Sequence, residues 1–169
     1  MNKIVKIKEK IGVVIPCYKV KNQILDVLRN IPDFVDYIYV VDDACPEMTG
    51  RHVEENITDS RIQVILHEKN KGVGAAVMSG YSAAIKQGVE IVVKIDGDGQ
   101  MDPHLISKFI YPIIIGDADY TKGNRFYNRD VIHQMPLMRL IGNGFLSFLT
   151  KFSTGYWSLF DPTNGYTAI

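Results

Sequence analysis

The sequence predicts an α/β fold in which a mostly parallel sheet is flanked by helices on both faces. Short apolar runs alternate with segments of helical periodicity up to about residue 110. The apolar runs are hydrophobic on both sides, as in strands that helices cover on two faces. Regular alternation of strand and helix is typical of parallel sheets with right-handed crossovers.

The expected strands are the apolar runs, at residues 11–15, 37–41, 62–66 and 91–95. Helices are expected between them, at 23–31 with Asn22 as cap, near 47–57 with a late cap at Thr49, and at 75–87 ended by Gly88. A further helix starts at Pro103 and reaches about residue 110, with Pro112 disturbing its end. Residues 120–122 form a candidate strand.

Charge balance, cysteine content and the lengths of the apolar runs indicate which classes of protein this chain fits. Lys+Arg and Asp+Glu both number 19, so bulk charge gives no reason to expect nucleic acid binding. Two cysteines, Cys17 and Cys45, and a charged N-terminus without an apolar leader predict reduced thiols in the cytoplasm. No apolar run reaches the roughly 20 residues that span a bilayer. The length of 169 residues fits one domain, 1–169, and the apolar end at 164–169 suggests that it is truncated at its C-terminus.

The strongest chemical signal is the turn after the run at 91–95. There Asp96, Gly97, Asp98, Gly99 and Gln100 place two carboxylates and an amide close together. Like charges at such a spacing repel unless a cation lies between them. Mg²⁺ or Mn²⁺ accepts such oxygen ligands and keeps positions open for phosphate. The sequence therefore predicts a metal–diphosphate site with Asp96, Asp98 and Gln100 as ligands, at the carboxyl end of a strand.

Other interpretations of this turn are weaker. Asp and Gly also occur in turns for backbone reasons alone. An EF-hand loop would need Gly at position 6 and Glu at position 12, where this chain has Met101 and Ser107. A phosphatase-type Asp-x-Asp nucleophile lacks its usual following Thr or Val.

Several other polar residues are candidates for binding. Asp42 and Asp43 end the second run, where a carboxylate can accept hydrogen bonds from a ribose or base or can cap a helix. Gly72-Val73-Gly74 matches half of a dinucleotide fingerprint, but Val77 replaces the third glycine. The four histidines show no metal spacing and are interpreted as surface or loop residues; they are His52, His67, His104 and His133.

Basic and acidic residues follow the metal turn. Arg125, Arg129 and Arg139 carry planar guanidinium groups that suit diphosphate, although each alone could be a solvated surface residue. Asp161 lies in a polar turn after an aromatic stretch and could be a base, an acceptor-side ligand or only part of the turn.

Residues 137–152 carry an apolar stripe at helical spacing. Such a stripe usually packs in a core. A helix of this kind can also lie on a membrane surface, so both interpretations stay open.

Six segments, taken in order, resemble one family: VVIPCYK at 13–19, VVDDACPEMT at 40–49, NKGVGAA at 70–76, DGDGQMDP at 96–103, GNRF at 123–126 and DPTNGY at 161–166. Together they resemble family 2 glycosyltransferases of the GT-A fold, which is Rossmann-like. Within that family the chain is most similar to polyprenol-phosphate sugar synthases, such as dolichol-phosphate mannose synthase. The likeness covers nearly the whole chain.

The resemblance implies roles for individual residues. Pro16, Tyr18 and Asp43 would line the nucleoside pocket, with Asp96 contributing, and Asp96, Asp98 and Gln100 would hold the metal. The remaining catalytic residues would be Arg125 and Arg139 on donor or acceptor phosphates and Asp161 near the acceptor. Two positions depart from the family: Gly97 stands where relatives often carry Ala, and Cys45 where they often carry Ser.

The implied reaction is an inverting transfer from a UDP- or GDP-linked sugar. The acceptor would be a polyprenyl phosphate, and in the alternative a glycan hydroxyl in polysaccharide synthesis. The protein would work in the cytoplasm at the inner face of the membrane, with peripheral membrane contact, and a homo-oligomer stays open. A nucleotidyltransferase and a non-catalytic nucleotide-sugar-binding module are the other classes considered.

Overall fold

The computed structural model describes residues 8–124, 137–155 and 164–169. The chain divides into two compact units. One comprises Met1–Thr121 with Tyr166–Ile169, and the other comprises Lys122–Gly165. The first unit contains the parallel part of the sheet and the cavity discussed below.

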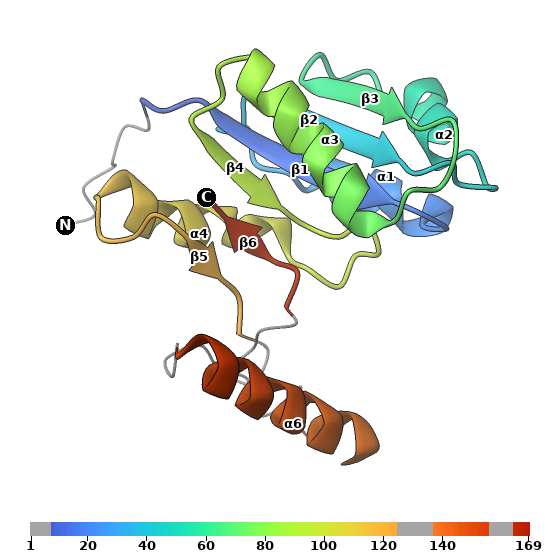
Figure 1. Ribbon diagram of the computed structural model, residues 1–169. Helices are drawn as coiled ribbons and strands as arrows, with labels where there is room; N and C mark the ends of the chain where they lie inside the picture. The colour runs from blue at the N-terminus through green and yellow to red at the C-terminus, as the bar shows by residue number, and fades with distance from the viewer. Residues whose placement is uncertain (1–7, 125–136, 156–163) are drawn as a thin grey trace. The chain divides into compact units, whose positions relative to one another are not determined.

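The sheet of six strands has the order β3-β2-β1-β4-β6-β5 (Figure 1). Its parallel part consists of β1 (Ile11–Cys17), β2 (Tyr37–Asp42), β3 (Ile62–Leu66) and β4 (Ile91–Lys94). The short β6 (Thr167–Ala168) pairs antiparallel with β4, and β5 (Thr121–Lys122) lies at the edge. The predicted α/β fold with a mostly parallel sheet is confirmed, whereas β6 was not predicted.

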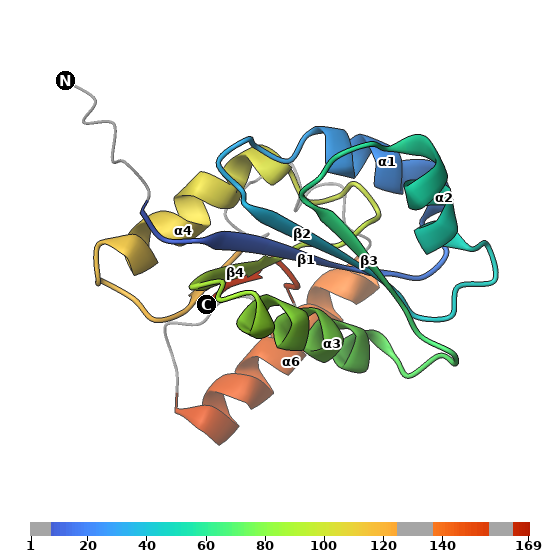
Figure 2. The same cartoon turned by 90° about the horizontal axis from the view of Figure 1, so that it is seen from above.

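Helices cover both faces of the sheet, as predicted (Figure 2). On one face lie α1 (Lys21–Arg29), α2 (Thr49–Asn56) and α4 (Ile106–Ile114), the last preceded by the 3-10 turn η1 (Pro103–Leu105). On the other face lies α3 (Val73–Lys86). Alternate residues of β1 point to opposite faces: Val13 and Ile15 are buried with α1 and α4, and Val14 is buried with α3.

The contact between α3 and β1 is close because Gly80 has no side chain. A Cβ atom placed on Gly80 would lie 2.4 Å from Val14 Cγ1. The small residues Ala76 and Ala84, one turn away on either side, are fully buried on the same face. This run of small residues lets α3 approach the sheet, which brings its N-terminus beside the ends of β1 and β2.

Several helix boundaries differ from the expectations. Val20, not Asn22, occupies the N-cap position of α1. Met48 precedes α2 in a left-handed conformation (φ 51°), and Thr49 is the first helical residue instead of the cap. A carboxylate from β2 caps this helix, because Gly50 N donates to Asp42 Oδ2 at 2.7 Å. Pro112 lies inside α4, which continues to Ile114.

The second unit contains α6 (Leu137–Thr154). Four residues at positions i, i+3, i+4 and i+7 of this helix are exposed: Phe145, Phe148, Leu149 and Phe152. The rings of Phe148 and Phe152 stack with centroids 6.5 Å apart. The apolar stripe predicted at 137–152 is therefore accessible in its described part. Of the helices that the structure describes, none combines the length and hydropathy needed to cross a bilayer.

Candidate functional site

A cavity of about 310 Å³ lies at the carboxyl ends of the parallel strands. The chain places β2 on one side of β1 and β4 on the other, so the strand order reverses here, as at the ligand sites of open α/β sheets. The cavity is lined by residues from the end of β1 and the loop after it, after β2, in and just before the start of α3, and after β4. These are Pro16, Cys17, Tyr18, Val20, Asp43, Asn70, Gly72, Val73, Ala76, Asp96, Gly97 and Asp98.

Asp96 and Asp98 line this same cavity. Asp98 is exposed, and its Oδ1 accepts a hydrogen bond from Gln100 N at 3.0 Å, which holds the tight turn. Gly97 between them is buried, and a Cβ there would lie 3.1 Å from Val20 Cγ2 and 3.2 Å from Ile24 Cδ1. A glycine thus lets the turn pack against α1 while both neighbouring carboxylates face one cavity.

Lys94 provides a positive charge beside the first of these carboxylates. It is the last residue of β4, and its side chain is only 10% exposed. Its Nζ lies 2.5 Å from Asp96 Oδ1, so one oxygen of Asp96 is already paired. The carboxylate pair therefore carries a smaller net negative charge than two free aspartates would.

Asp43, directly after β2, is buried and lines the same cavity. Its Oδ1 accepts hydrogen bonds from His67 Nδ1 at 2.7 Å and from Lys71 N at 2.9 Å, and its Oδ2 accepts one from Gly72 N at 2.7 Å. Burial works to raise the pKa of this carboxyl, but the Lys71 N–H, the His67 ring and the Gly72 N–H outweigh it and lower the pKa below its usual value. Asp43 is thus held ionised and fixes the loop before α3.

Gly72 makes that loop possible. Its φ of 86° and ψ of 159° lie in a region open essentially to glycine alone. In this conformation its N–H points to Asp43 while the chain enters α3. The neighbouring Asp42, in contrast, is a structural residue, since it accepts from Cys45 N at 2.6 Å and from Gly50 N. The sequence placed both carboxylates together, and the structure separates their roles.

The loop after β1 is tied to the loop after β2 through Cys45. Lys19 N donates to Cys45 Sγ at 3.0 Å, and Cys45 Sγ is 3.2 Å from Thr49 Oγ1. Burial works to raise the pKa of the Cys45 thiol, whereas its hydrogen bonds with Thr49 and with the N–H groups of Lys19 and Glu47 lower it overall. Burial and the nearby Asp42 raise the pKa of Cys17. Tyr18 remains half-exposed at the cavity wall.

Gln100, the third predicted metal ligand, lies beside Asp98 but does not line the cavity of Asp43 and Asp96. It lines a neighbouring cavity with Asp98, Met101, Asp102 and His104 at the N-terminal side of α4. In the same region Tyr166 donates through its hydroxyl to Asp102 O at 3.0 Å and stacks on Phe109, with ring centroids 4.0 Å apart. Asp98 is the residue shared by both cavities.

The structure brings together Pro16, Tyr18, Asp43, Asp96 and Asp98 of the predicted site. Arg125 and Asp161, like Arg129, lie outside the described residues. Arg139 lies in α6, where the backbone is described and its side chain is not.

Two residues of this region were not predicted from the sequence. His67 lies in the loop after β3, as one of the two predicted alternatives had it, but its side chain is only 5% exposed and is bonded through both ring nitrogens, which the sequence did not predict. Lys94 lies at the end of an apolar strand and was not considered as a site residue from the sequence. Its spacing of two residues from Asp96 was the available signal, because such residues lie on the same side of an extended chain.

Comparisons with known proteins show the family and the fold of this chain. The family model described as Glycosyl transferase family 2 matches residues 12–169. The UDP-N-acetylglucosamine–dolichyl-phosphate N-acetylglucosaminyltransferase of Methanococcus voltae is 34% identical, over 94% of this chain and 68% of that protein. The polyprenol monophosphomannose synthase of Mycolicibacterium smegmatis is 29% identical, over 78% of this chain and 50% of that protein.

Among solved structures, glucosyl-3-phosphoglycerate synthase from Mycobacterium tuberculosis, in complex with Mn²⁺, UDP and glucosyl-3-phosphoglycerate, has the same fold. The TM-score is 0.70 at 20% identity, over 95% of this chain and 56% of that one. The chain thus spans between half and about two thirds of the length of these three proteins.

Proposed function

Because the chain belongs to glycosyl transferase family 2, we propose that it transfers a sugar from a UDP- or GDP-linked donor to a polyprenyl phosphate. The names of the Methanococcus voltae and Mycolicibacterium smegmatis relatives support a lipid-phosphate acceptor. The observation that carries the proposal is the single cavity shared by Asp43, Asp96 and Asp98. It offers an acceptor for a nucleoside at one wall and carboxylates for a metal-bound diphosphate at the other.

The residues present fit a divalent cation that binds together with the donor. Within the described ranges, three or more His, Cys, Asp or Glu side chains do not gather into a site of their own for a metal ion. Mg²⁺ sites of nucleotide enzymes commonly use one or two carboxylates and complete the shell with phosphate oxygens and water. Asp96 and Asp98 would hold the ion in this way. Bound Mg²⁺ or Mn²⁺ would neutralise charge developing on the leaving nucleoside diphosphate.

The residues of the chain would bind and orient the two substrates. Asp43 would accept from the nucleoside, and Tyr18 and Pro16 would border it. Arg125 and Arg139 are proposed for donor or acceptor phosphates, since guanidinium groups pair with them bidentately. A phosphate acceptor is already anionic at neutral pH, so Asp161 would orient it instead of removing a proton. A single displacement by this oxygen inverts the anomeric carbon.

A membrane surface is the proposed place of the reaction. The exposed face of α6 carries Phe145, Phe148, Leu149 and Phe152. Aromatic and leucine side chains on one face are typical of helices that lie in the interface between headgroups and acyl chains. A polyprenyl phosphate keeps its phosphate at this level, so contact of α6 with the inner face of the membrane would bring the enzyme to its acceptor.

A transfer assay tests the proposal. The protein is incubated with UDP- and GDP-linked sugars, a short polyprenyl phosphate and Mn²⁺, and the lipid product is separated by chromatography. We expect a sugar–phosphate-linked lipid together with free UDP or GDP. Release of sugar 1-phosphate, with the nucleoside monophosphate on the lipid, would instead indicate nucleotidyl transfer. Binding of the donor without product in the presence of every acceptor would indicate a non-catalytic binding module.

A further inference from the structure

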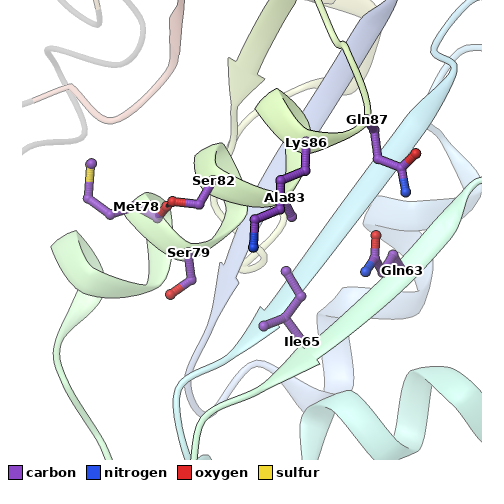
Figure 3. A pocket seen from close by; sticks show the side chains of 8 residues that line it. All are labelled: Gln63, Ile65, Met78, Ser79, Ser82, Ala83, Lys86 and Gln87. Carbon is purple, nitrogen blue, oxygen red and sulfur yellow. Dashed lines mark hydrogen bonds between the residues drawn. The ribbon is translucent and has the colours of Figure 1, made fainter.

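A buried histidine connects two cavities of the first unit. His67 Nδ1 is bonded to Asp43 in the donor cavity, and His67 Nε2 lies 2.8 Å from Ser79 Oγ. Ser79 lines a groove between β3 and α3, together with Gln63 and Ile65 from β3 and Ser82 and Lys86 from α3 (Figure 3). The order Asp–His–Ser invites comparison with a hydrolase triad.

The chain around Ser79 does not support a nucleophile. Ser79 lies in the middle of α3, where backbone N–H groups are engaged in helical hydrogen bonds. An acyl-transfer site needs free N–H groups directed at the developing oxyanion beside the nucleophile. The Ser79 hydroxyl instead fixes the orientation of the His67 ring, because an imidazole held at both nitrogens cannot turn.

The His67 contact limits the number of hydrogen bonds that Asp43 can still accept. An ionised carboxylate has about four lone-pair positions, two on each oxygen. Among the described residues, His67 Nδ1 and Lys71 N occupy Oδ1, and Gly72 N occupies one position of Oδ2. One acceptor position therefore remains, on Oδ2, for a group in the cavity that Asp43 lines.

This remaining acceptor distinguishes the two donor bases. Guanine presents two parallel donors, N1–H and N2–H, which grip a carboxylate through both of its oxygens. Uracil presents one, N3–H. Resting on the proposed function, we infer that His67 is a positioning residue that fills Asp43 Oδ1 and thereby makes the site select a UDP-linked over a GDP-linked sugar.

A water molecule bound to Asp43 Oδ1 would not select between the bases, because a base N–H could displace it with little loss of free energy. The His67 ring cannot be displaced in this way, because it is buried and held by Ser79. The Lys71 and Gly72 N–H groups are equally fixed, since they belong to the loop that leads into α3. Selectivity would thus come from donors that a competing nucleotide is unable to displace.

Two substitutions separate selection from general support of the loop. His67→Asn places its amide Nδ2 near the position of His67 Nδ1 and keeps the donor to Asp43. His67→Ala removes that donor. The matched control is His52→Ala, since His52 lies on α2 and is bonded to Asn56, away from the cavity. For each protein the dissociation constants of UDP and GDP are measured by calorimetry with Mn²⁺.

We expect the wild-type protein and the His52→Ala variant to bind UDP at least about tenfold more tightly than GDP, which is the worth of one good hydrogen bond. His67→Ala should reduce this ratio about tenfold, and His67→Asn should retain it. A wild-type preference for GDP, or an unchanged ratio in His67→Ala, would overturn the inference and leave the proposed function intact. Failure of the wild-type protein to bind either nucleotide would instead refute the proposed function.

Discussion

Lys94 Nζ and Asp96 Oδ1 are 2.5 Å apart at the end of β4, so the ammonium group of a lysine lies beside a proposed metal ligand. Because the ammonium group already offsets one carboxylate, a divalent ion gains less from Asp96 and Asp98 than from two free aspartates. The phosphates of the donor supply the missing negative charge. We therefore expect metal and nucleotide to bind cooperatively.

Lys94→Met should bind Mn²⁺ more tightly in the absence of nucleotide. A gain of about tenfold or more is expected, since a unit charge about 4 Å away is worth between about 1 kcal/mol in bulk water and about 4 kcal/mol near a protein surface. Mn²⁺ titration followed by electron paramagnetic resonance measures this without turnover. Lys108→Met, on α4, is the control. Equal Mn²⁺ affinity in Lys94→Met and wild type would show that the ion pair does not weaken the site.

The lowered pKa of Asp43 makes part of the folding free energy depend on pH. The unfolded carboxyl titrates near pH 3.9, above the folded value. The stabilisation is therefore complete above the unfolded pKa and is lost as pH falls through the folded one. Asp43→Asn should lose about 1–3 kcal/mol at pH 7, because buried N–H groups lose their carboxylate.

Urea unfolding at pH 7, 5, 4 and 3 checks this prediction. Asp59 also has a lowered pKa, through hydrogen bonds from Arg61, so acid destabilises both proteins to some extent. The difference between wild type and Asp43→Asn should shrink between pH 5 and pH 3. A constant difference across that range would mean that Asp43 does not contribute through its charge.

Gly72 and Gly74 form a matched pair for the loop before α3. Gly72 has a φ of 86°, so Gly72→Ala should destabilise the fold by about 1–3 kcal/mol through backbone strain and should weaken nucleotide binding. Gly74 lies within α3, and a Cβ there meets nothing within 4 Å among the described residues, so Gly74→Ala should stabilise the fold by about 0.5–1 kcal/mol. Thermal unfolding and UDP calorimetry compare them. Similar effects of the two variants would contradict the special conformation of Gly72.

The exposed face of α6 should bind membranes. Replacing Phe148 and Phe152 by serine removes two large apolar side chains that are 55% and 75% exposed. Binding to anionic vesicles should fall at least about tenfold, because full burial of one phenylalanine is worth about 1.5–3 kcal/mol. Flotation of the protein with vesicles measures the bound fraction, and Ser153→Ala on the same helix is the control. Wild-type protein that stays at the bottom of the gradient would refute membrane contact through this face.

Periodicity and strand-end chemistry were sufficient to predict much of this fold. The runs at 11–15, 37–41 and 62–66 became β1, β2 and β3, because apolar runs of this length between polar turns have few other ways to be buried. The antiparallel β6 could not be predicted. It has two residues, and its position depends on pairing with β4, distant in sequence.

The candidate site was predicted to a similar extent. That Asp43, Asp96 and Asp98 lie at one cavity could be predicted, because each follows a strand of the parallel set and such ends meet at one edge of a sheet. The positions of His67 and Lys94 in this region could not be predicted, since their contacts depend on which side chains β2, α3 and the turn after β4 bring together. The predicted N-cap of α2 was wrong for the same reason. Asp42, at the end of β2, caps this helix in place of the local residue Thr49.

The proposed transfer depends on the carboxylates after β4, which would hold a metal that binds the diphosphate of the donor. Calorimetry of UDP binding with and without Mn²⁺ tests it most directly, in wild-type protein, in Asp98→Ala and in Asp117→Ala, which alters an exposed aspartate outside the cavity. We expect Mn²⁺ to strengthen UDP binding in wild type and Asp117→Ala, and this increase to disappear in Asp98→Ala. An undiminished metal-dependent increase in Asp98→Ala would contradict the claim.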